Sequence, residues 1–184
     1  MRTIKYDWSP GVLIVFVLML IAGWGMRASM TGLVNSYESE KEKLKFMYPG
    51  GWAVTAGIGY TLNEFLNMND ADVRMYLVSQ PPYENSSFGI GFLRNTENQG
   101  NYLGYRRLGG KETTVGGQPG YEIEFAYVDL SRDESMPPRV FFIKETLVLR
   151  NDRLLIFSVA APESKYNAVC STFDQVLNTV QFGK

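Results

Sequence analysis

The stretch Thr113-Thr-Val-Gly-Gly-Gln-Pro-Gly-Tyr-Glu-Ile-Glu-Phe-Ala-Tyr127 decides the fold class of this chain. Its middle part, Gly116-Gly-Gln-Pro-Gly120, is rich in turn-forming residues and predicts the turn of a β-hairpin. In the second arm, apolar residues at every other position from Tyr121 onward alternate with Glu122 and Glu124. This period of two predicts a strand with one face against a core. We therefore expect an antiparallel sheet.

Further strand patterns lie on both sides of this hairpin. Short apolar runs bounded by glycine, proline or polar residues predict strands over residues 45–48, 52–54, 74–79, 88–92, 140–149 and 154–160. The polar run Arg150-Asn-Asp-Arg153 predicts a tight turn between the last two of them. Residues 62–68 predict a short helix of one or two turns.

The C-terminal segment, residues 164–180, has the pattern of an amphipathic helix. Apolar side chains recur at three- and four-residue spacing from Tyr166 through Phe173 to Val180. Cys170 neighbours this stripe, so we expect it to be a small buried apolar residue rather than a reactive thiol. The predicted fold class is α+β, with an antiparallel sheet flanked by helices.

The N-terminal part has a different composition, because residues 8–26 contain no charged side chain. As a helix these 19 residues are roughly 28 Å long, close to the hydrocarbon thickness of a bilayer. We predict an N-terminal tail (1–9), a transmembrane helix (10–28), a polar linker (29–43) and an extramembrane domain (44–184). The alternative is a cleaved signal peptide, for which Ala28-Ser-Met30 is a poor cleavage site.

The short tail and the large C-terminal domain also predict an orientation. We expect one membrane crossing in the inner (plasma) membrane, with the C-terminal domain on the periplasmic or extracellular side. Positive charges at both ends of the apolar stretch, Arg2 and Lys5 before it and Arg27 after it, nearly balance each other.

Composition excludes several kinds of site. The 184 residues include one cysteine and no histidine, which excludes a histidine-dependent nucleophile, an imidazole metal site and an intrachain disulfide. The formal net charge of −1 lacks the basic excess of a nucleic-acid-binding protein. We therefore predict no catalytic, cofactor-binding or metal-binding residues, no cofactor, and a protein that is not an enzyme.

Two sets of residues have both a functional and an ordinary interpretation. Glu122 and Glu124, with Asp129 and the pair Asp133-Glu134 further on, offer oxygens of the kind that Ca²⁺ or Mg²⁺ prefers, but we favour a solvated acidic face. Gly57-Ile-Gly59 lacks the remaining residues of a phosphate-binding loop.

Two other short motifs have both a functional and an ordinary interpretation. Arg106-Arg107, with Tyr102 and Tyr105, combines cations and aromatic rings that suit a partner or an anionic headgroup, whereas an ordinary polar loop is the expected interpretation. Asn85-Ser-Ser87 matches a glycosylation acceptor, a motif that is frequent by chance.

The order of three motifs resembles the PsbP family of photosystem II extrinsic proteins and their bacterial relatives. They are Tyr48-Pro-Gly-Gly-Trp52, the hairpin from Thr113 to Phe125, and Asp152-Arg-Leu-Leu-Ile-Phe-Ser-Val-Ala-Ala-Pro-Glu163 followed by the terminal helix. The resemblance covers about residues 44–184. It implies an α/β/α sandwich that acts as an accessory or assembly protein of photosynthetic complexes. Unlike plant members, this chain has an apolar N-terminal helix and no histidine, which favours a bacterial membrane complex.

We therefore expect a non-catalytic accessory or structural subunit of a bacterial membrane electron-transfer complex, photosynthetic or respiratory. Its expected partners are integral membrane subunits and the bilayer through helix 10–28, and extramembrane subunits through the domain, with no nucleic acid. The first alternative is a membrane-anchored binding module for a small or lipidic ligand that uses the aromatic-rich sheet face. The second is a carboxylate-dependent hydrolase.

Overall fold

The structure is a computed structural model that describes residues 10–82, 86–130 and 137–183. These residues form three helices, α1 (Pro10–Thr31), α2 (Ser87–Asn101) and α3 (Glu163–Asn178). The described strands are β1 (Leu33–Ser39), β2 (Leu44–Pro49), β3 (Trp52–Ala56), β4 (Thr61–Asn67), β5 (Arg74–Gln80), β6 (Arg106–Val115), β7 (Gln118–Asp129), β8 (Arg139–Arg150), β9 (Arg153–Pro162) and β10 (Gln181–Phe182).

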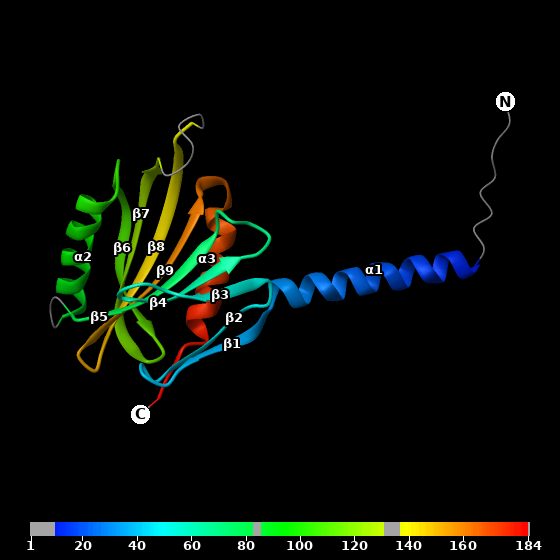
Figure 1. Cartoon of the computed structure of the whole chain (residues 1–184), viewed down its shortest axis with the longest axis horizontal. Helices are drawn as coiled ribbons and strands as arrows, with labels where there is room; N and C mark the ends of the chain where they lie inside the picture. The colour runs from blue at the N-terminus through cyan, green and yellow to red at the C-terminus, as the bar shows by residue number, and fades with distance from the viewer. Residues whose placement is uncertain (1–9, 83–85, 131–136, 184) are drawn as a thin grey trace.

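Seven strands form the central sheet, in the order β3-β4-β5-β9-β8-β7-β6. Each pair of neighbours is antiparallel. Helix α2 lies on one face of this sheet, and helix α3 and the small sheet β1-β2-β10 lie on the other (Figure 1). The antiparallel sheet flanked by helices that the sequence predicts is confirmed.

The hairpin that decides the fold class forms as expected. Val115 pairs with Gln118 across the turn, and Gly116 and Gly117 adopt φ angles of 54° and 78°, which glycine reaches without strain. Ile123 and Phe125 are fully buried on the α2 side of the sheet. The alternation of β7 thus sorts its side chains between the two faces of the sheet.

The second hairpin and the last helix are also confirmed. β8 and β9 meet at the pair Arg150 and Arg153, with Asn151 and Asp152 at φ angles of 48° and 55°. Two successive positive φ angles are typical of a type I′ turn, whose twist matches that of the strands. Helix α3 buries Tyr166 and Phe173 against the sheet, together with Val176 and Leu177.

Two predicted elements are wrong. Residues 62–68 were expected to be helical, but they lie in and just after strand β4, which pairs with β3 and β5 on its two sides. Residues 88–92 were expected to form a strand and instead begin helix α2. The side-chain oxygen of Ser86 caps this helix by accepting the N–H of Gly89 at 3.1 Å, so the helix start overrides the alternating pattern.

The predicted linker, residues 29–43, also needs correction. Strand β1 lies inside it and pairs with β2, because Leu33 and Tyr37 pack against the core on the α3 side. The first strand–turn–strand is present as well, although β2 and β3 enter different sheets.

Residues 10–28 are helical, since they lie within α1, which projects away from the sheets (Figure 1). Among the described residues, no helix combines the length and the apolar character needed to cross a membrane. The predicted tail, residues 1–9, lies outside the described part of the chain.

Candidate functional site

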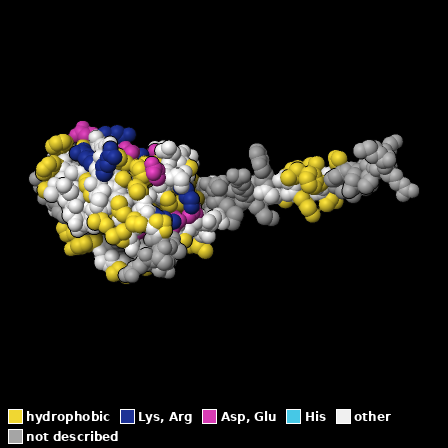
Figure 2. Space-filling model, turned by 90° about the horizontal axis from the view of Figure 1, so that it is seen from above, with side chains coloured by type: hydrophobic (Ala, Val, Ile, Leu, Met, Phe, Trp, Pro, Cys, Tyr) yellow, Lys and Arg dark blue, Asp and Glu magenta, His cyan; other side chains and the backbone are white. Residues whose placement is uncertain are grey.

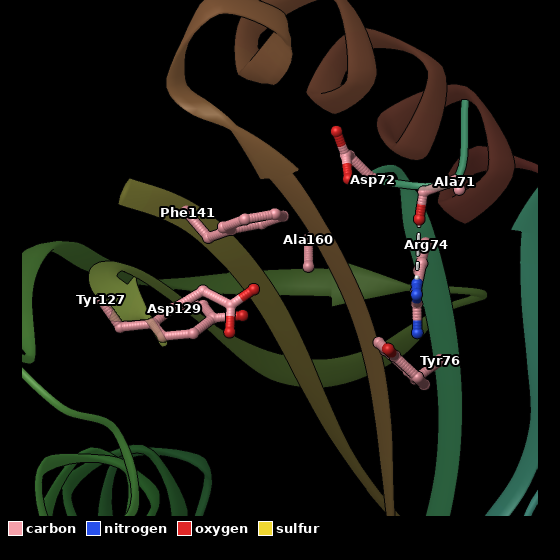
Figure 3. A pocket seen from close by; sticks show the side chains of 8 residues that line it. All are labelled: Ala71, Asp72, Arg74, Tyr76, Tyr127, Asp129, Phe141 and Ala160. Atoms are coloured by element: carbon pink, nitrogen blue, oxygen red, sulfur yellow. Dashed lines mark hydrogen bonds between the residues drawn. The ribbon is translucent and has the colours of Figure 1, made fainter. Parts of the chain in front are cut away.

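A pocket of about 240 Å³ opens on the sheet face that α2 covers, at the end of the sheet where β5 begins and β7 ends (Figure 3). It is lined by Ala71, Asp72, Arg74, Tyr76, Tyr127, Asp129, Phe141 and Ala160. These residues come from one loop and four strands. Charged, phenolic and apolar groups therefore share one small space.

The sheet register puts the wall residues in place. Arg74 of β5 pairs with Ala160 of β9, and Tyr127 of β7 pairs with Phe141 of β8. Figure 3 shows Arg74 and Asp129 on opposite sides of the pocket. Alternation along β5 and β7 sends Arg74 and Tyr76, and likewise Tyr127 and Asp129, to this face.

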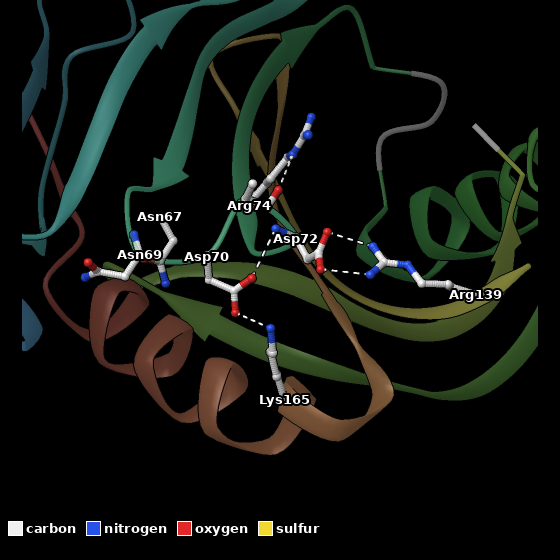
Figure 4. Close-up of polar contacts among 8 residues, drawn as sticks. Asn67, Asn69, Asp70, Asp72, Arg74, Arg139 and Lys165 are labelled. Atoms are coloured by element: carbon white, nitrogen blue, oxygen red, sulfur yellow. Dashed lines mark hydrogen bonds and ion pairs between the residues drawn. The ribbon is translucent and has the colours of Figure 1, made fainter. Parts of the chain in front are cut away.

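The loop between β4 and β5 supplies Asp72 and is held by ion pairs (Figure 4). Arg139 donates to both carboxylate oxygens of Asp72, at 2.7 and 2.9 Å, and its guanidinium lies 5.2 Å from the centre of the Phe141 ring. On the other side of the loop, Lys165 of α3 pairs with Asp70. A bidentate arginine–carboxylate pair fixes orientation as well as distance, so this rim of the pocket is preorganised.

Arg74 is oriented by two acceptors. Its Nε donates to the carbonyl oxygen of Ala71 at 3.1 Å, and its Nη1 donates to the carboxylate of Glu64 at 3.4 Å. Arg74 also interacts with the hydroxyl group of Tyr76, and a guanidinium has five N–H groups in all. Arg74 therefore has further donors to offer on the pocket side.

The tyrosines of the pocket are hydrogen-bond donors over the whole neutral range. Burial, and then the charge of Asp129, raise the pKa of Tyr127 to about 12. Burial also raises the pKa of Tyr76, with the Glu64 carboxylate acting in the same direction. A phenol with a raised pKa keeps its proton, so both rings present an O–H at neutral pH.

The acidic strand face is not solvated, contrary to expectation. Glu122 is only 7% exposed and pairs with Lys144 and with Lys111, each at 3.1 Å. Lys144 also pairs with Asp174 of α3 at 2.8 Å, so these charges join the sheet to the helix. In the described ranges, no group of three or more histidine, cysteine, aspartate or glutamate side chains could hold a metal ion.

Arg106-Arg107 and the tyrosines near them do not form a patch. Tyr102 and Tyr105 stack on the buried ring of Phe125, with ring centres 5.1 and 5.0 Å away. Arg106 is exposed, and Arg107 donates to the phenol oxygen of Tyr121 at 3.3 Å. The two tyrosine rings are thus part of the apolar cluster on the α2 side, and the two arginine side chains lie outside it.

The remaining sequence candidates have structural roles or lie outside the described residues. Burial raises the pKa of Cys170 to about 11, with the neighbouring Tyr166 acting in the opposite direction, which fits the expectation of an unreactive thiol. Ser86 caps α2, whereas Asn85 and the pair Asp133-Glu134 lie outside the described residues.

Sequence reasoning singled out only Asp129 among the charged residues of the pocket. The missed residues are Asp72, Arg74 and Tyr76. A usable signal was present in β5, where Arg74 and Tyr76 alternate with the buried residues Met75 and Leu77. Polar or phenolic side chains on one face of a central strand indicate that the apolar core does not extend over that part of the sheet, which can therefore line a binding site.

No family profile matches the sequence, and no curated protein is significantly similar to it. The fold, in contrast, is shared with solved structures. The solution structure of the cyanobacterial PsbP (CyanoP) from Synechocystis superposes with a TM-score of 0.61 at 17% identity, over 81% of this chain and 92% of that protein. The chain therefore has a PsbP-like α+β fold.

Two other proteins share this fold at lower identity. The Ran-binding protein Mog1p from Saccharomyces cerevisiae has a TM-score of 0.59 at 10% identity, covering 80% of this chain and 94% of its own. LpqN from Mycobacterium tuberculosis, described as involved in cell envelope biogenesis, has a TM-score of 0.59 at 11% identity, covering 77% and 83%. At these identities the likeness shows the fold alone.

Proposed function

We propose that this chain is a non-catalytic accessory subunit of a bacterial membrane complex, and that the complex belongs to an electron-transfer chain. The observation that carries the proposal is helix α1, whose apolar side chains lie outside the folded domain. The PsbP-like fold supports the class of accessory protein, and the motif resemblance supports electron transfer as its setting.

The apolar side chains of α1 are exposed, so we expect them to lie in an apolar environment. Each residue from position 13 to position 21 is between 44% and 68% exposed. Figure 2 shows these hydrophobic side chains gathered on the described part of the helix, away from the domain. A continuous exposed apolar surface marks a membrane or a protein interaction site. We propose that α1 inserts beside integral membrane subunits and holds the domain on the periplasmic or extracellular side.

The domain offers a second contact on α2. Phe88 and Phe92 are 65% and 63% exposed and are four residues apart, so they lie on one face of the helix. Exposed phenylalanines one turn apart are suitable anchors for a neighbouring subunit, since aromatic residues are enriched at interfaces. We propose that the extramembrane partner packs on this face.

The test is co-purification from native membranes in a mild detergent. The tagged wild-type chain is expected to bring down integral redox subunits in fixed stoichiometry. Val15→Lys combined with Leu18→Lys places charges in α1 and is expected to abolish recovery of these subunits. Leu103→Lys, at an exposed position outside α1, is the matched control and is expected to leave recovery unchanged.

Two results would overturn this proposal. One is recovery of the wild-type chain as a monomer. The other is equal recovery of the same subunits by wild type and by the α1 variant.

The pocket favours a second function, a binding module for a small ligand. The sequence analysis assigns such a ligand to the aromatic-rich sheet face. On β7 most of that face is covered by α2 and the loop that follows it. The pocket begins where this cover ends, at Tyr127 and Asp129. A concave site with a few convergent polar groups is the usual form of a small-molecule site.

A further inference from the structure

We propose that the pocket between β5 and β7 binds a small zwitterion, that is, a compact molecule with an ammonium group and a carboxylate group. This inference rests on the small-ligand function and is independent of the accessory role of α1. It follows from the arrangement of charges on two opposed walls.

The wall formed by β7 suits the ammonium end. Asp129 and Tyr127 lie on the same face of the strand, and a carboxylate has several lone-pair positions for donors. The rings of Tyr127 and Phe141 are neighbours, with centres 5.9 Å apart. The ring of Phe141 already contacts the guanidinium of Arg139. The ring of Tyr127 is therefore the aromatic face beside Asp129 that attracts a ligand cation through its quadrupole.

The wall formed by β5 suits the carboxylate end. Arg74 is positioned by the Ala71 carbonyl and by Glu64, and its guanidinium fork matches the geometry of a carboxylate. Tyr76 lies next to it on the same face, keeps its O–H at neutral pH and interacts with both Arg74 and Glu64. Both groups favour an anionic partner on this side of the pocket.

The distance between the walls limits the size of the ligand. β9 and β8 separate β5 from β7, so the two backbones are three strand spacings, or roughly 14 Å, apart. Arg74 and Asp129 line this space from opposite sides (Figure 3). Ala160 forms part of the floor, and its small side chain leaves the centre of the pocket open. Only a short molecule fits between the charged groups.

Charge balance favours a zwitterion over a simple ion. The Asp72 carboxylate is paired with Arg139, and Arg74 is paired with Glu64. A cation on its own would leave the remaining donors of Arg74 without an acceptor, and an anion on its own would lie close to the carboxylate of Asp129. Like charges brought together in a binding site are unfavourable. A molecule with both charges, oriented along the line between the walls, avoids both penalties.

The test uses the full chain in mild detergent, with glycine betaine as the probe and isothermal titration calorimetry as the measurement. Tetramethylammonium and acetate, each carrying one of its two charged ends, are titrated in parallel. We expect betaine to bind at least tenfold more tightly than either ion. Arg74→Gln and Asp129→Asn are each expected to weaken betaine binding at least tenfold, whereas Arg106→Gln, an exposed arginine outside the pocket, leaves it unchanged.

Ala160→Leu provides a variant that blocks the pocket without changing any charge. It is expected to abolish betaine binding, and a cooperative thermal transition confirms that each variant is folded. If tetramethylammonium binds as tightly as betaine and Arg74→Gln has no effect, the zwitterion inference is wrong although the small-ligand function stands. If none of the three probes binds, the inference is wrong and the pocket no longer supports that function.

Discussion

The layers on the two faces of the central sheet are held in place by different interactions. On the α3 side, aromatic residues from the sheet, from β2 and from α3 meet in one apolar core, with Phe46, Phe65, Phe157 and Phe173 no more than 2% exposed. On the α2 side, a smaller apolar cluster surrounds an ion pair between Arg94 and Glu145. The difference shows how one sheet can anchor a stable core and also present a site.

The ion pair under α2 is geometrically complete. Arg94 donates to both oxygens of Glu145, at 2.9 and 2.6 Å, and the amide of Asn98 donates to the same carboxylate at 2.8 Å. Desolvation offsets much of the attraction in such buried pairs, so they contribute orientation more than stability. We infer that the polar contacts fix the position of α2, whereas apolar burial fixes the position of α3.

The largest effect is expected for Phe157→Ala, which removes a buried ring from the α3-side core. Large-to-small changes of this kind cost about 3–5 kcal/mol, because lost burial is joined by the cavity that remains. The measurement is the free energy of unfolding from urea titration followed by circular dichroism. A loss below about 1 kcal/mol would mean that the α3-side core is not close-packed.

Glu145→Ala tests the ion pair between Arg94 and Glu145, which holds α2 on its face of the sheet. It leaves the Arg94 guanidinium buried, with Glu97 as the remaining acidic partner among the described residues, and a cost of about 3 kcal/mol is expected. Glu97→Ala is the matched control, since this half-exposed carboxylate forms a surface-type pair worth less than about 1 kcal/mol. Equal losses of unfolding free energy for the two variants in urea titration would contradict a main role of Glu145 in holding α2.

Gly91→Ala tests how closely α2 lies on the sheet. An added Cβ would lie 2.3 Å from a ring carbon of Tyr121, so the helix must shift, at a cost of about 1–3 kcal/mol. Gly100→Ala in the same helix meets nothing within 4 Å and is expected to stabilise the protein by up to about 1 kcal/mol. If both variants change the thermal midpoint in the same direction, the close contact at Gly91 is absent.

Apart from the control variants, Ser86→Ala is expected to have the smallest effect. It removes the cap that accepts the N–H of Gly89 and should cost about 1 kcal/mol. Hydrogen exchange of the first turn of α2 is the measurement, and α3 serves as the internal reference. Unchanged exchange at the start of α2 would contradict a capping role for Ser86.

The elements that could be predicted from the sequence are those whose pattern and turn chemistry agree. The β6–β7 and β8–β9 hairpins have both, and α3 has an uninterrupted apolar stripe. β4 and the start of α2 were mispredicted because their local patterns conflict with their surroundings. Pairing with strands on both sides decides β4, whereas a cap and close packing on Tyr121 decide α2.

The site could be predicted only in part, because it is assembled from distant segments. Asp72 and Arg139 are 67 residues apart in the chain and are brought together by the order of the strands. The sequence pattern was interpreted as grouping Asp129 with Glu122 and Glu124, but Asp129 lies on the opposite face of β7, beside Tyr127. Its position opposite Arg74 depends on the intervening strands β9 and β8, and no local pattern encodes that order.

Native-state hydrogen exchange distinguishes a helix α3 that belongs to the stable core from a helix α2 that is held separately beside the site. We expect amides in the middle of α3 to exchange only through global unfolding, and those in the middle of α2 to exchange through a smaller opening with a lower free energy. Glu145→Ala should widen this difference. Equal opening free energies for the two helices, unchanged by Glu145→Ala, would show that α2 is not a separately held layer.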